Sequence, residues 1–129
     1  MDFNVWLLLA CIVVLIITRF IPVKGITNIT TYEAKSKFKE KKVQFIDVRT
    51  PGEYNRNHQP PFRNIPLYEL TQRLKELDKN KVVVVICQSG IRSSKAARVL
   101  KRKGFTQIYN VKGGMGSWKK QNNESSAAK

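Results

Sequence analysis

Cysteine is scarce in this chain of 129 residues, which contains only Cys11 and Cys87. Cys11 lies inside an apolar segment near the N-terminus and Cys87 lies deep in the remainder, so a structural disulfide between them is not expected. The roughly one hundred residues after the apolar segment are enough for one hydrophobic core without disulfides. A single thiol in that part suits a reducing compartment, where it stays free to react.

Acidic residues are also few. The chain has 9 Asp and Glu against 24 Lys and Arg, which gives a net charge of +15. Such a charge attracts nucleic acid, anionic lipid or a small anionic substrate. The sequence has no zinc-finger spacing and no aromatic RNA-binding motif, so nucleic acid is not expected as a partner. Solubility and attraction to an acidic bilayer surface are the simpler explanation of the excess of basic over acidic residues.

Charged side chains are absent from Phe3 to Thr18, and Val5 to Ile17 is an unbroken apolar run. The segment from Phe3 to Val23 is 21 residues long. At about 1.5 Å per residue, a helix of this length would cross a hydrocarbon layer of about 30 Å. We therefore expect residues 1–23 to form an uncleaved transmembrane helix that anchors the chain.

Two other interpretations of this segment remain open. A cleaved signal peptide should begin with basic residues, but the only charged side chain before the apolar run is Asp2. The sequence from Leu8 to Cys11 loosely resembles a lipoprotein cleavage box, yet it also lacks a basic region before it. For an anchor, the basic residues that follow the span predict that the rest of the chain faces the cytoplasm.

Strand and helix patterns alternate over residues 24–118. The segment from Lys81 to Ile86 is β-branched without alternation, as is typical of a strand covered on both faces. Other extended segments are expected at 26–29, 43–48, 64–66 and 108–111, and helices at 30–39, 67–77 and 93–103. This order predicts one α/β domain with a mainly parallel sheet and a ligand site at the carboxyl ends of the strands. The polar tail, residues 119–129, is expected to be disordered.

The segment from Val82 to Ser93 contains the candidate reactive residue, Cys87, and the loop around it. A buried strand delivers Cys87 to its carboxyl end, a tight loop follows, and a helix begins at once. Successive backbone N–H groups in such a loop form an anion-binding nest, and the helix N-terminus adds partial positive charge. Gly90 permits a backbone shape that a side chain would resist.

These features favour a thiolate at Cys87. A free cysteine has a pKa of about 8.5, and a helix N-terminus or a nearby cation lowers that pKa. The helix dipole supplies about one pKa unit, so the loop amides and Arg92 would have to supply the rest. Such a loop can also hold the outer sulfur of a persulfide or an anionic donor such as thiosulfate. Without this context, a buried cysteine at a strand end would be interpreted as a small hydrophobic residue.

Four motifs in this order resemble the rhodanese-like family, and the match covers residues 26–118. They are the Cys87–Ser93 loop, Asp47-Val48-Arg49, His58 with Asn64-Ile65-Pro66, and Gly113-Gly114 with Trp118. The resemblance implies a five-stranded, mostly parallel sheet with helices on both faces, and no metal or organic cofactor. Four residues separate Cys87 from Arg92, which is the loop length of the sulfur-transferring members. The phosphatase relatives have a loop that is one residue longer.

The resemblance also implies roles for individual residues. Cys87 would be the nucleophile, and the substrate would be bound by Gln88, Ser89, Gly90, Ile91 and Arg92, the first four through backbone N–H groups. Three residues are expected to support the site rather than touch substrate: Asp47, Arg49 and His58. A role of His58 as a general base is the less favoured alternative.

We therefore expect a sulfurtransferase whose Cys87 takes a sulfane sulfur from an anionic donor, thiosulfate or a persulfide. The sulfur would pass to a thiol or another nucleophilic acceptor, and a protein acceptor is possible. Two departures from the family pattern bear on this. Asn57 replaces the usual glycine, although Asn tolerates left-handed backbone, and Pro60 to Arg63 replaces a run that often borders the site. The alternative is a non-catalytic, membrane-tethered interaction module.

Overall fold

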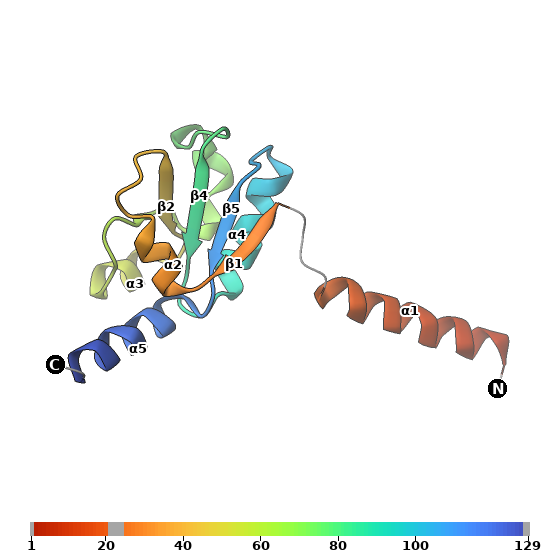
Figure 1. Cartoon of the computed structure of the whole chain (residues 1–129). Helices are drawn as coiled ribbons and strands as arrows, with labels where there is room; N and C mark the ends of the chain where they lie inside the picture. Colours follow the sequence, from red (N-terminus) through yellow and green to blue (C-terminus); the bar gives the residue numbers. More distant parts are fainter. Residues whose placement is uncertain (1, 21–24, 128–129) are drawn as a thin grey trace.

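The computed structural model describes residues 2–20 and 25–127, and its domain is built on one five-stranded sheet (Figure 1). The strands are β1 (Ile26–Ile29), β2 (Val43–Asp47), β3 (Arg63–Asn64), β4 (Val82–Ile86) and β5 (Ile108–Val111). Their order across the sheet is β1-β5-β4-β2-β3, and every neighbouring pair is parallel. The expected sheet is confirmed, and β4 lies at its centre.

Helices cover both faces of the sheet, as the family resemblance implied. On one face lie α2 (Thr31–Ser36) and α5 (Gly114–Ala127), and on the other lie α4 (Ile91–Arg102) and the 3₁₀ segments η1 (Leu67–Glu69) and η2 (Thr71–Glu76). A further short helix, α3 (Pro51–Arg56), follows β2 at the carboxyl edge of the sheet. The core is accordingly divided by the sheet into two apolar clusters.

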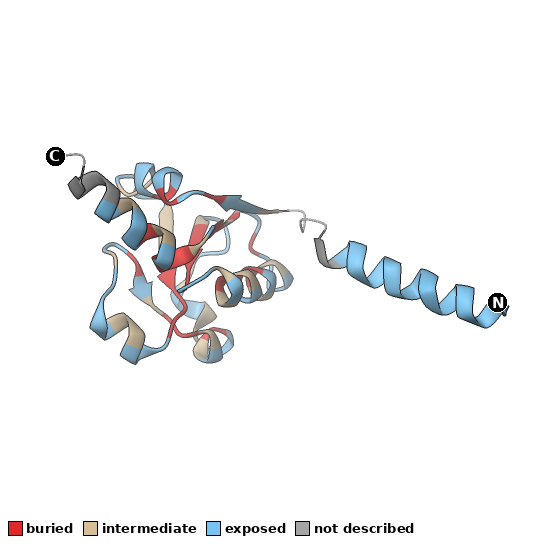
Figure 2. Cartoon of the chain, turned by 90° about the horizontal axis from the view of Figure 1, so that it is seen from below, coloured by how far each residue is buried: buried red, intermediate tan, exposed pale blue. Residues whose placement is uncertain are grey.

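Strand β4 explains why the sheet is stable between these layers. Val83 and Val85 pack into the cluster under α4, whereas Val84 and Ile86 pack into the cluster under α5, and all four are fully buried. Side chains alternate between the two faces of a strand, so a strand buried on both faces needs continuous apolar sequence. Figure 2 shows the buried residues concentrated in the sheet.

The amphipathic helix expected over 67–77 is instead the pair of 3₁₀ segments η1 and η2. Its leucines nevertheless line the core, as predicted: Leu70 is buried, and Leu67, Leu74 and Leu77 pack against the same cluster. Two of the leucine spacings are three residues, which matches the three residues per turn of a 3₁₀ helix. The spacing therefore identified the buried side correctly but not the type of helix.

Two other elements differ from expectation. Helix α2 ends at Ser36 rather than near residue 39, and Phe38 packs edge-on against Phe45 and stacks on Trp118. The tail expected to be disordered continues α5 as far as Ala127, and its end at 128–129 lies outside the described residues. The hydroxyl of Thr31 donates a hydrogen bond to the side-chain oxygen of Gln121, which ties this helix to α2.

The N-terminal apolar segment forms α1 (Phe3–Phe20), which projects away from the domain in Figures 1 and 2. Its apolar side chains are exposed all round, for example Trp6 at 60% and Leu15 at 64%. Within residues 2–20 and 25–127, no helix has the length and apolar character that crossing a membrane requires. The last residues of the expected anchor, 21–23, lie outside the described residues.

Candidate active site

Cys87 is the first residue after β4, and its side chain is fully buried. The backbone N–H of Gly90 donates a hydrogen bond to the sulfur at 3.0 Å, so the loop curls back over its first residue. Gly90 has a φ of 103°, in the left-handed region that glycine adopts without strain, and α4 begins at the next residue. The loop thus holds the sulfur at the N-terminus of α4, as the sequence predicted.

Opposing effects act on the ionisation of Cys87. Burial disfavours the charged thiolate and is the largest single influence, but hydrogen bonds outweigh it and lower the pKa of Cys87 below its ordinary value. The donors are the hydroxyl of Ser93 and the backbone N–H groups of Ser93, Gly90 and Ser89. The site therefore favours a nucleophilic thiolate.

A polar cluster beneath Cys87 was not predicted as part of the site. The hydroxyl oxygen of Ser93 lies 3.3 Å from the Cys87 sulfur and 2.5 Å from the side-chain oxygen of Asn110, which comes from β5. The amide nitrogen of Asn110 donates to Ser94 and to Asn28. Ser93 and Asn110 are buried, so this cluster fixes the position of the hydroxyl oxygen that contacts the sulfur.

The start of α5 supports the loop from behind. The N–H of Met115 donates to the carbonyl oxygen of Cys87 at 2.8 Å, and the N–H of Gly116 donates to that of Gln88 at 3.0 Å. A side chain at Gly114 would overlap the carbonyl oxygen of Cys87, so only glycine allows this approach. This contact accounts for Gly114, one of the two glycines that the sequence analysis singled out. Gly113 beside it has a φ of 76°, in the left-handed region that favours glycine.

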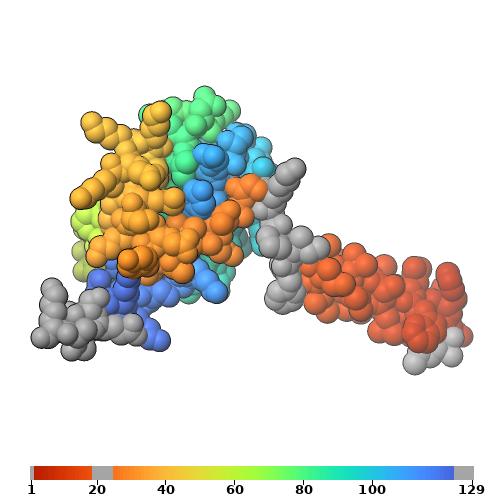
Figure 3. All heavy atoms as spheres, in the orientation of Figure 1, coloured from red at the N-terminus to blue at the C-terminus, as the bar shows by residue number. Residues whose placement is uncertain are grey.

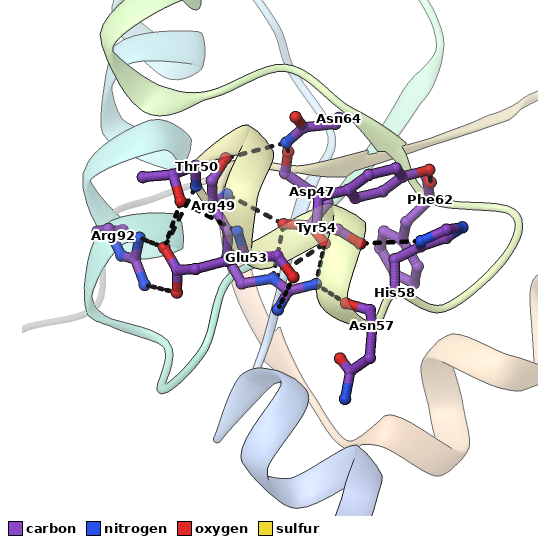
Figure 4. A network of polar contacts seen from close by, with 10 residues as sticks. All are labelled: Asp47, Arg49, Thr50, Glu53, Tyr54, Asn57, His58, Phe62, Asn64 and Arg92. Carbon is purple, nitrogen blue, oxygen red and sulfur yellow. Dashed lines mark hydrogen bonds and ion pairs between the residues drawn. The ribbon is translucent and has the colours of Figure 1, made fainter.

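Arg92 is engaged by an acidic residue that the sequence analysis did not assign to the site. Its guanidinium forms an ion pair with Glu53 through two hydrogen bonds, of 2.6 and 2.9 Å (Figure 4). Glu53 is the third residue of α3 and also closes a reciprocal capping arrangement with Thr50. The hydrogen bond from Arg92 is the main reason that the pKa of Glu53 falls to about 2. Arg92 thereby joins the Cys87 loop to α3.

Asp47 and Arg49 form a buried ion pair beside this contact, with 2.9 Å between their side chains. Arg49 also donates to the carbonyl oxygens of Glu53 and Asn57, so it holds the middle and the C-terminal end of α3. The side chain of Asn64 donates to the carbonyl oxygens of Asp47 and Arg49. Both residues of the pair therefore lie at the end of β2, where their contacts hold the neighbouring backbone and α3.

His58 lies on the outer side of α3. Its Nδ1 is 2.9 Å from the carbonyl oxygen of Tyr54, and the two rings stack with centroids 4.0 Å apart. The Tyr54 hydroxyl donates to the carbonyl oxygen of Phe62, which ties α3 to the Pro60–Arg63 segment. Asn57 has an extended backbone, with φ of −160°, so the left-handed conformation considered for it is not used.

The remaining loop residues are open to solvent. Gln88 and Ser89 are exposed, and Ile91 is 71% exposed at the rim of the site. In the part of the chain that the structure describes, no three His, Cys, Asp or Glu side chains gather as metal ligands would. The chemistry of the site therefore centres on the Cys87 sulfur and the groups that donate to it.

The family of rhodanese-like domains matches residues 30–121, and the chain belongs to this family. The uncharacterized protein YqhL of Bacillus subtilis (strain 168) is 46% identical over 78 residues, which are 60% of this chain and 62% of that protein. The match thus spans less than two thirds of YqhL. The thiosulfate sulfurtransferase GlpE of Pseudomonas syringae pv. syringae (strain B728a) is 31% identical over 87 residues, 67% of this chain and 82% of that protein.

Solved structures show the same relationship. The crystal structure of a rhodanese-like domain protein from Staphylococcus aureus is similar with a TM-score of 0.66 and 36% identity. The similarity covers 71% of this chain and 90% of that chain. The fold described above is therefore that of a rhodanese-like domain.

Proposed function

We propose that this protein is a sulfurtransferase that carries sulfur as a persulfide on Cys87. The observation that carries the proposal is the buried sulfur at the end of β4, which receives hydrogen bonds from Gly90 and Ser93 and has a lowered pKa. These contacts favour a thiolate, which is the nucleophilic form of cysteine. The similarity to a thiosulfate sulfurtransferase supports the same chemistry.

In the first step, the Cys87 thiolate attacks the sulfane sulfur of the donor. With thiosulfate, a new S–S bond forms at Cys87 while the S–S bond of thiosulfate breaks, and sulfite leaves with the electron pair. The outer sulfur of the persulfide is then itself an anion. The loop N–H groups and the N-terminus of α4 supply partial positive charge where this anion forms.

In the second step, the thiolate of an acceptor attacks the outer sulfur. The persulfide S–S bond breaks, the acceptor becomes the persulfide, and Cys87 returns as a thiolate, so no oxidant or reductant is consumed. Ile91 and Gln88 lie exposed at the rim of the loop, and an acceptor must approach across them. The acceptor is a small thiol or a protein thiol.

Mass spectrometry of the intact chain after exposure to thiosulfate tests the proposal. The expected result is a gain of one sulfur atom on Cys87, removed by a reducing thiol. Cys87→Ser should show no such adduct, whereas Cys11→Ser should show it unchanged. Absence of the adduct with both thiosulfate and a persulfide donor would overturn the proposal and favour a non-catalytic interaction module.

We also propose that α1 holds the domain at a lipid membrane, with the domain on the cytoplasmic side. Its apolar side chains are exposed all round and project away from the domain, and an apolar surface of this kind favours a non-aqueous environment. Flotation of the intact chain with neutral phosphatidylcholine vesicles tests this, because an uncharged surface does not attract the basic domain. Leu8→Asp combined with Ile12→Asp should abolish flotation, and flotation that survives this change contradicts the proposal.

A further inference from the structure

The amino edge of the sheet, where the parallel strands begin, is densely basic. Lys41 and Lys42 immediately precede β2, and Lys79 and Lys81 precede β4. All four side chains are exposed. Because every strand pair is parallel, these two segments lie at the same end of the domain.

Helix α4 brings more positive charge to this edge. The chain returns along α4 to the beginning of β5, and the helix ends in Lys101, Arg102 and Lys103, the last as its C-cap. We define the basic edge by its exposed cations: Lys39, Lys41, Lys42, Lys79, Lys81, Arg102 and Lys103. The same segments contain only two acidic residues, Glu40 and Asp78.

The carboxyl edge of the sheet, which carries the Cys87 loop, is different. Arg49 is buried and paired with Asp47, and the guanidinium of Arg92 is paired with Glu53. Lys112 is an exposed cation directly after β5. Arg56 in α3, Lys95 in α4, and Lys119 and Lys120 in α5 are also exposed, so the domain carries cations elsewhere too. The basic edge differs in that it gathers seven exposed cations from three short chain segments.

Helix α1 joins the domain at the basic edge. The first described residues after it, Gly25 and the start of β1 at Ile26, lie at that edge because β1 runs parallel to β5. The ammonium of Lys101 approaches Gly25 closely. In Figures 1 and 3 the gold, green and blue segments that precede β2, β4 and β5 occupy the upper end of the domain, away from α5.

We propose that the basic edge binds the surface of an anionic lipid bilayer, so that the Cys87 loop faces away from the membrane. Charge complementarity and the attachment of an exposed apolar helix at the same edge both point to a bilayer as the occupant. Lysines near an anionic surface each strengthen binding about fivefold. The five residues of β4 separate the two edges by about 16 Å.

This orientation has a consequence for sulfur transfer, which rests on the proposed function. A persulfide on Cys87 would be presented to the aqueous phase while the domain lies on the bilayer. Its acceptor would then be a soluble thiol or a soluble protein, rather than a group embedded in the lipid.

Binding of the intact chain to vesicles, measured by sedimentation at several salt concentrations, tests the proposal. Vesicles containing phosphatidylglycerol should bind more tightly than pure phosphatidylcholine vesicles, and the difference should shrink with salt. The triple variant Lys42→Gln, Lys81→Gln, Lys103→Gln should weaken binding to the anionic vesicles about a hundredfold. Its binding to neutral vesicles, which reports only on α1, should stay unchanged.

A matched variant controls for net charge. Lys112→Gln, Lys119→Gln, Lys120→Gln removes the same charge from exposed residues after β5 and in α5, and it should bind anionic vesicles nearly as the natural chain does. Equal losses in the two triple variants, or no preference for anionic lipid, would overturn the proposal. Persulfide formation on Cys87, measured on the same samples, reports separately on the proposed function.

Discussion

The hydroxyl oxygen of Ser93 lies 3.3 Å from the sulfur of Cys87 and 2.5 Å from the side-chain oxygen of Asn110. A hydroxyl has one hydrogen, so it cannot donate to both neighbours at once. A neutral thiol can donate to Ser93 while Ser93 donates to Asn110. A thiolate only accepts, so Ser93 donates to it only by turning its hydrogen away from Asn110. Ionisation of Cys87 is therefore coupled to the orientation of this hydroxyl.

Ser93→Ala should raise the pKa of Cys87 by about one to two units, because a hydrogen bond to a charged group contributes about 1.5–3 kcal/mol and one pKa unit corresponds to about 1.4 kcal/mol. Burial raises the pKa of Cys87, and without the Ser93 hydroxyl fewer hydrogen bonds remain to offset that effect. The pH dependence of Cys87 alkylation, in a Cys11→Ser background, measures the shift.

Ser94→Ala is the matched control for this experiment. The Ser94 hydroxyl donates to the carbonyl oxygen of Gly90 and accepts from Asn110, one step away from the sulfur. Its removal should move the pKa of Cys87 less than the removal of Ser93 does. Equal shifts in the two variants would show that Ser93 acts by packing and not by its contact with the sulfur.

The ion pair between Glu53 and Arg92 should make stability depend on acid pH. The pKa of Glu53 is about 2 in the folded chain against an ordinary value of 4.5. The pair therefore stabilises the fold above pH 4.5, and this contribution is lost as the pH falls towards 2. Glu53→Gln should lower the free energy of unfolding by about 1 kcal/mol at pH 7, and by little near pH 2. Urea unfolding at a series of pH values measures both.

Glu40→Gln is the control for Glu53→Gln, because Glu40 is an exposed carboxylate on the opposite edge of the sheet. It should leave the pH dependence of unfolding as it is in the natural chain. The idea that Glu53 and Arg92 join α3 to the Cys87 loop fails if the two glutamine variants unfold alike at every pH.

The parts of the site that could be predicted from the sequence are those encoded in short, continuous segments. The apolar run before Cys87, the glycine at position 90 and the helix pattern after it lie within a few residues of one another. A strand, loop and helix of this kind follow from local preferences, so the position of the sulfur at the N-terminus of α4 was predictable.

The residues that were missed reach the site from elsewhere in the chain. Asn110 contacts Ser93 across 17 positions in sequence, and Glu53 contacts Arg92 across 39. The first contact requires β4 and β5 to be neighbours, which pairs Val85 with Asn110, and no local pattern determines strand order. The sequence did contain one indication for Glu53. Thr50 and Glu53 form a helix-capping pattern, which places the carboxylate of Glu53 at the start of a helix.

Arg49→Met should destabilise the fold by about 3–5 kcal/mol, because it leaves the carboxylate of Asp47 buried without its cation. It also removes the donors to the carbonyl oxygens of Glu53 and Asn57. Urea unfolding at neutral pH measures the loss.

Arg63→Met provides the comparison with a solvent-exposed ion pair. Arg63 pairs with Glu76 at 2.6 Å, but its side chain is 52% exposed, so its loss should cost less than about 1 kcal/mol. Similar losses in the two variants would mean that Arg49 does not have the special role in holding α3 that its buried contacts indicate.

Gly114→Ala should impair sulfur transfer by displacing the Cys87 loop. The added Cβ would overlap the carbonyl oxygen of Cys87, and Gly114 has a φ of 55°, which a side chain adopts with strain. Because the N–H of Met115 bonds to that same carbonyl oxygen, the helix and the loop must move apart together. The expected result is slower persulfide formation and a lower free energy of unfolding, by about 1–3 kcal/mol.

Gly52→Ala separates this effect from the general cost of replacing a glycine. Gly52 lies in α3, and a Cβ there would meet no atom within 4 Å. Alanine favours the helix by up to about 1 kcal/mol, so this variant should be as stable as the natural chain or more so, with persulfide formation unchanged. If Gly114→Ala forms the persulfide at the natural rate while Gly52→Ala behaves as expected, the close approach of α5 is not needed to shape the loop. The hydrogen bonds from Gly90 and Ser93 would then suffice to hold the sulfur in place.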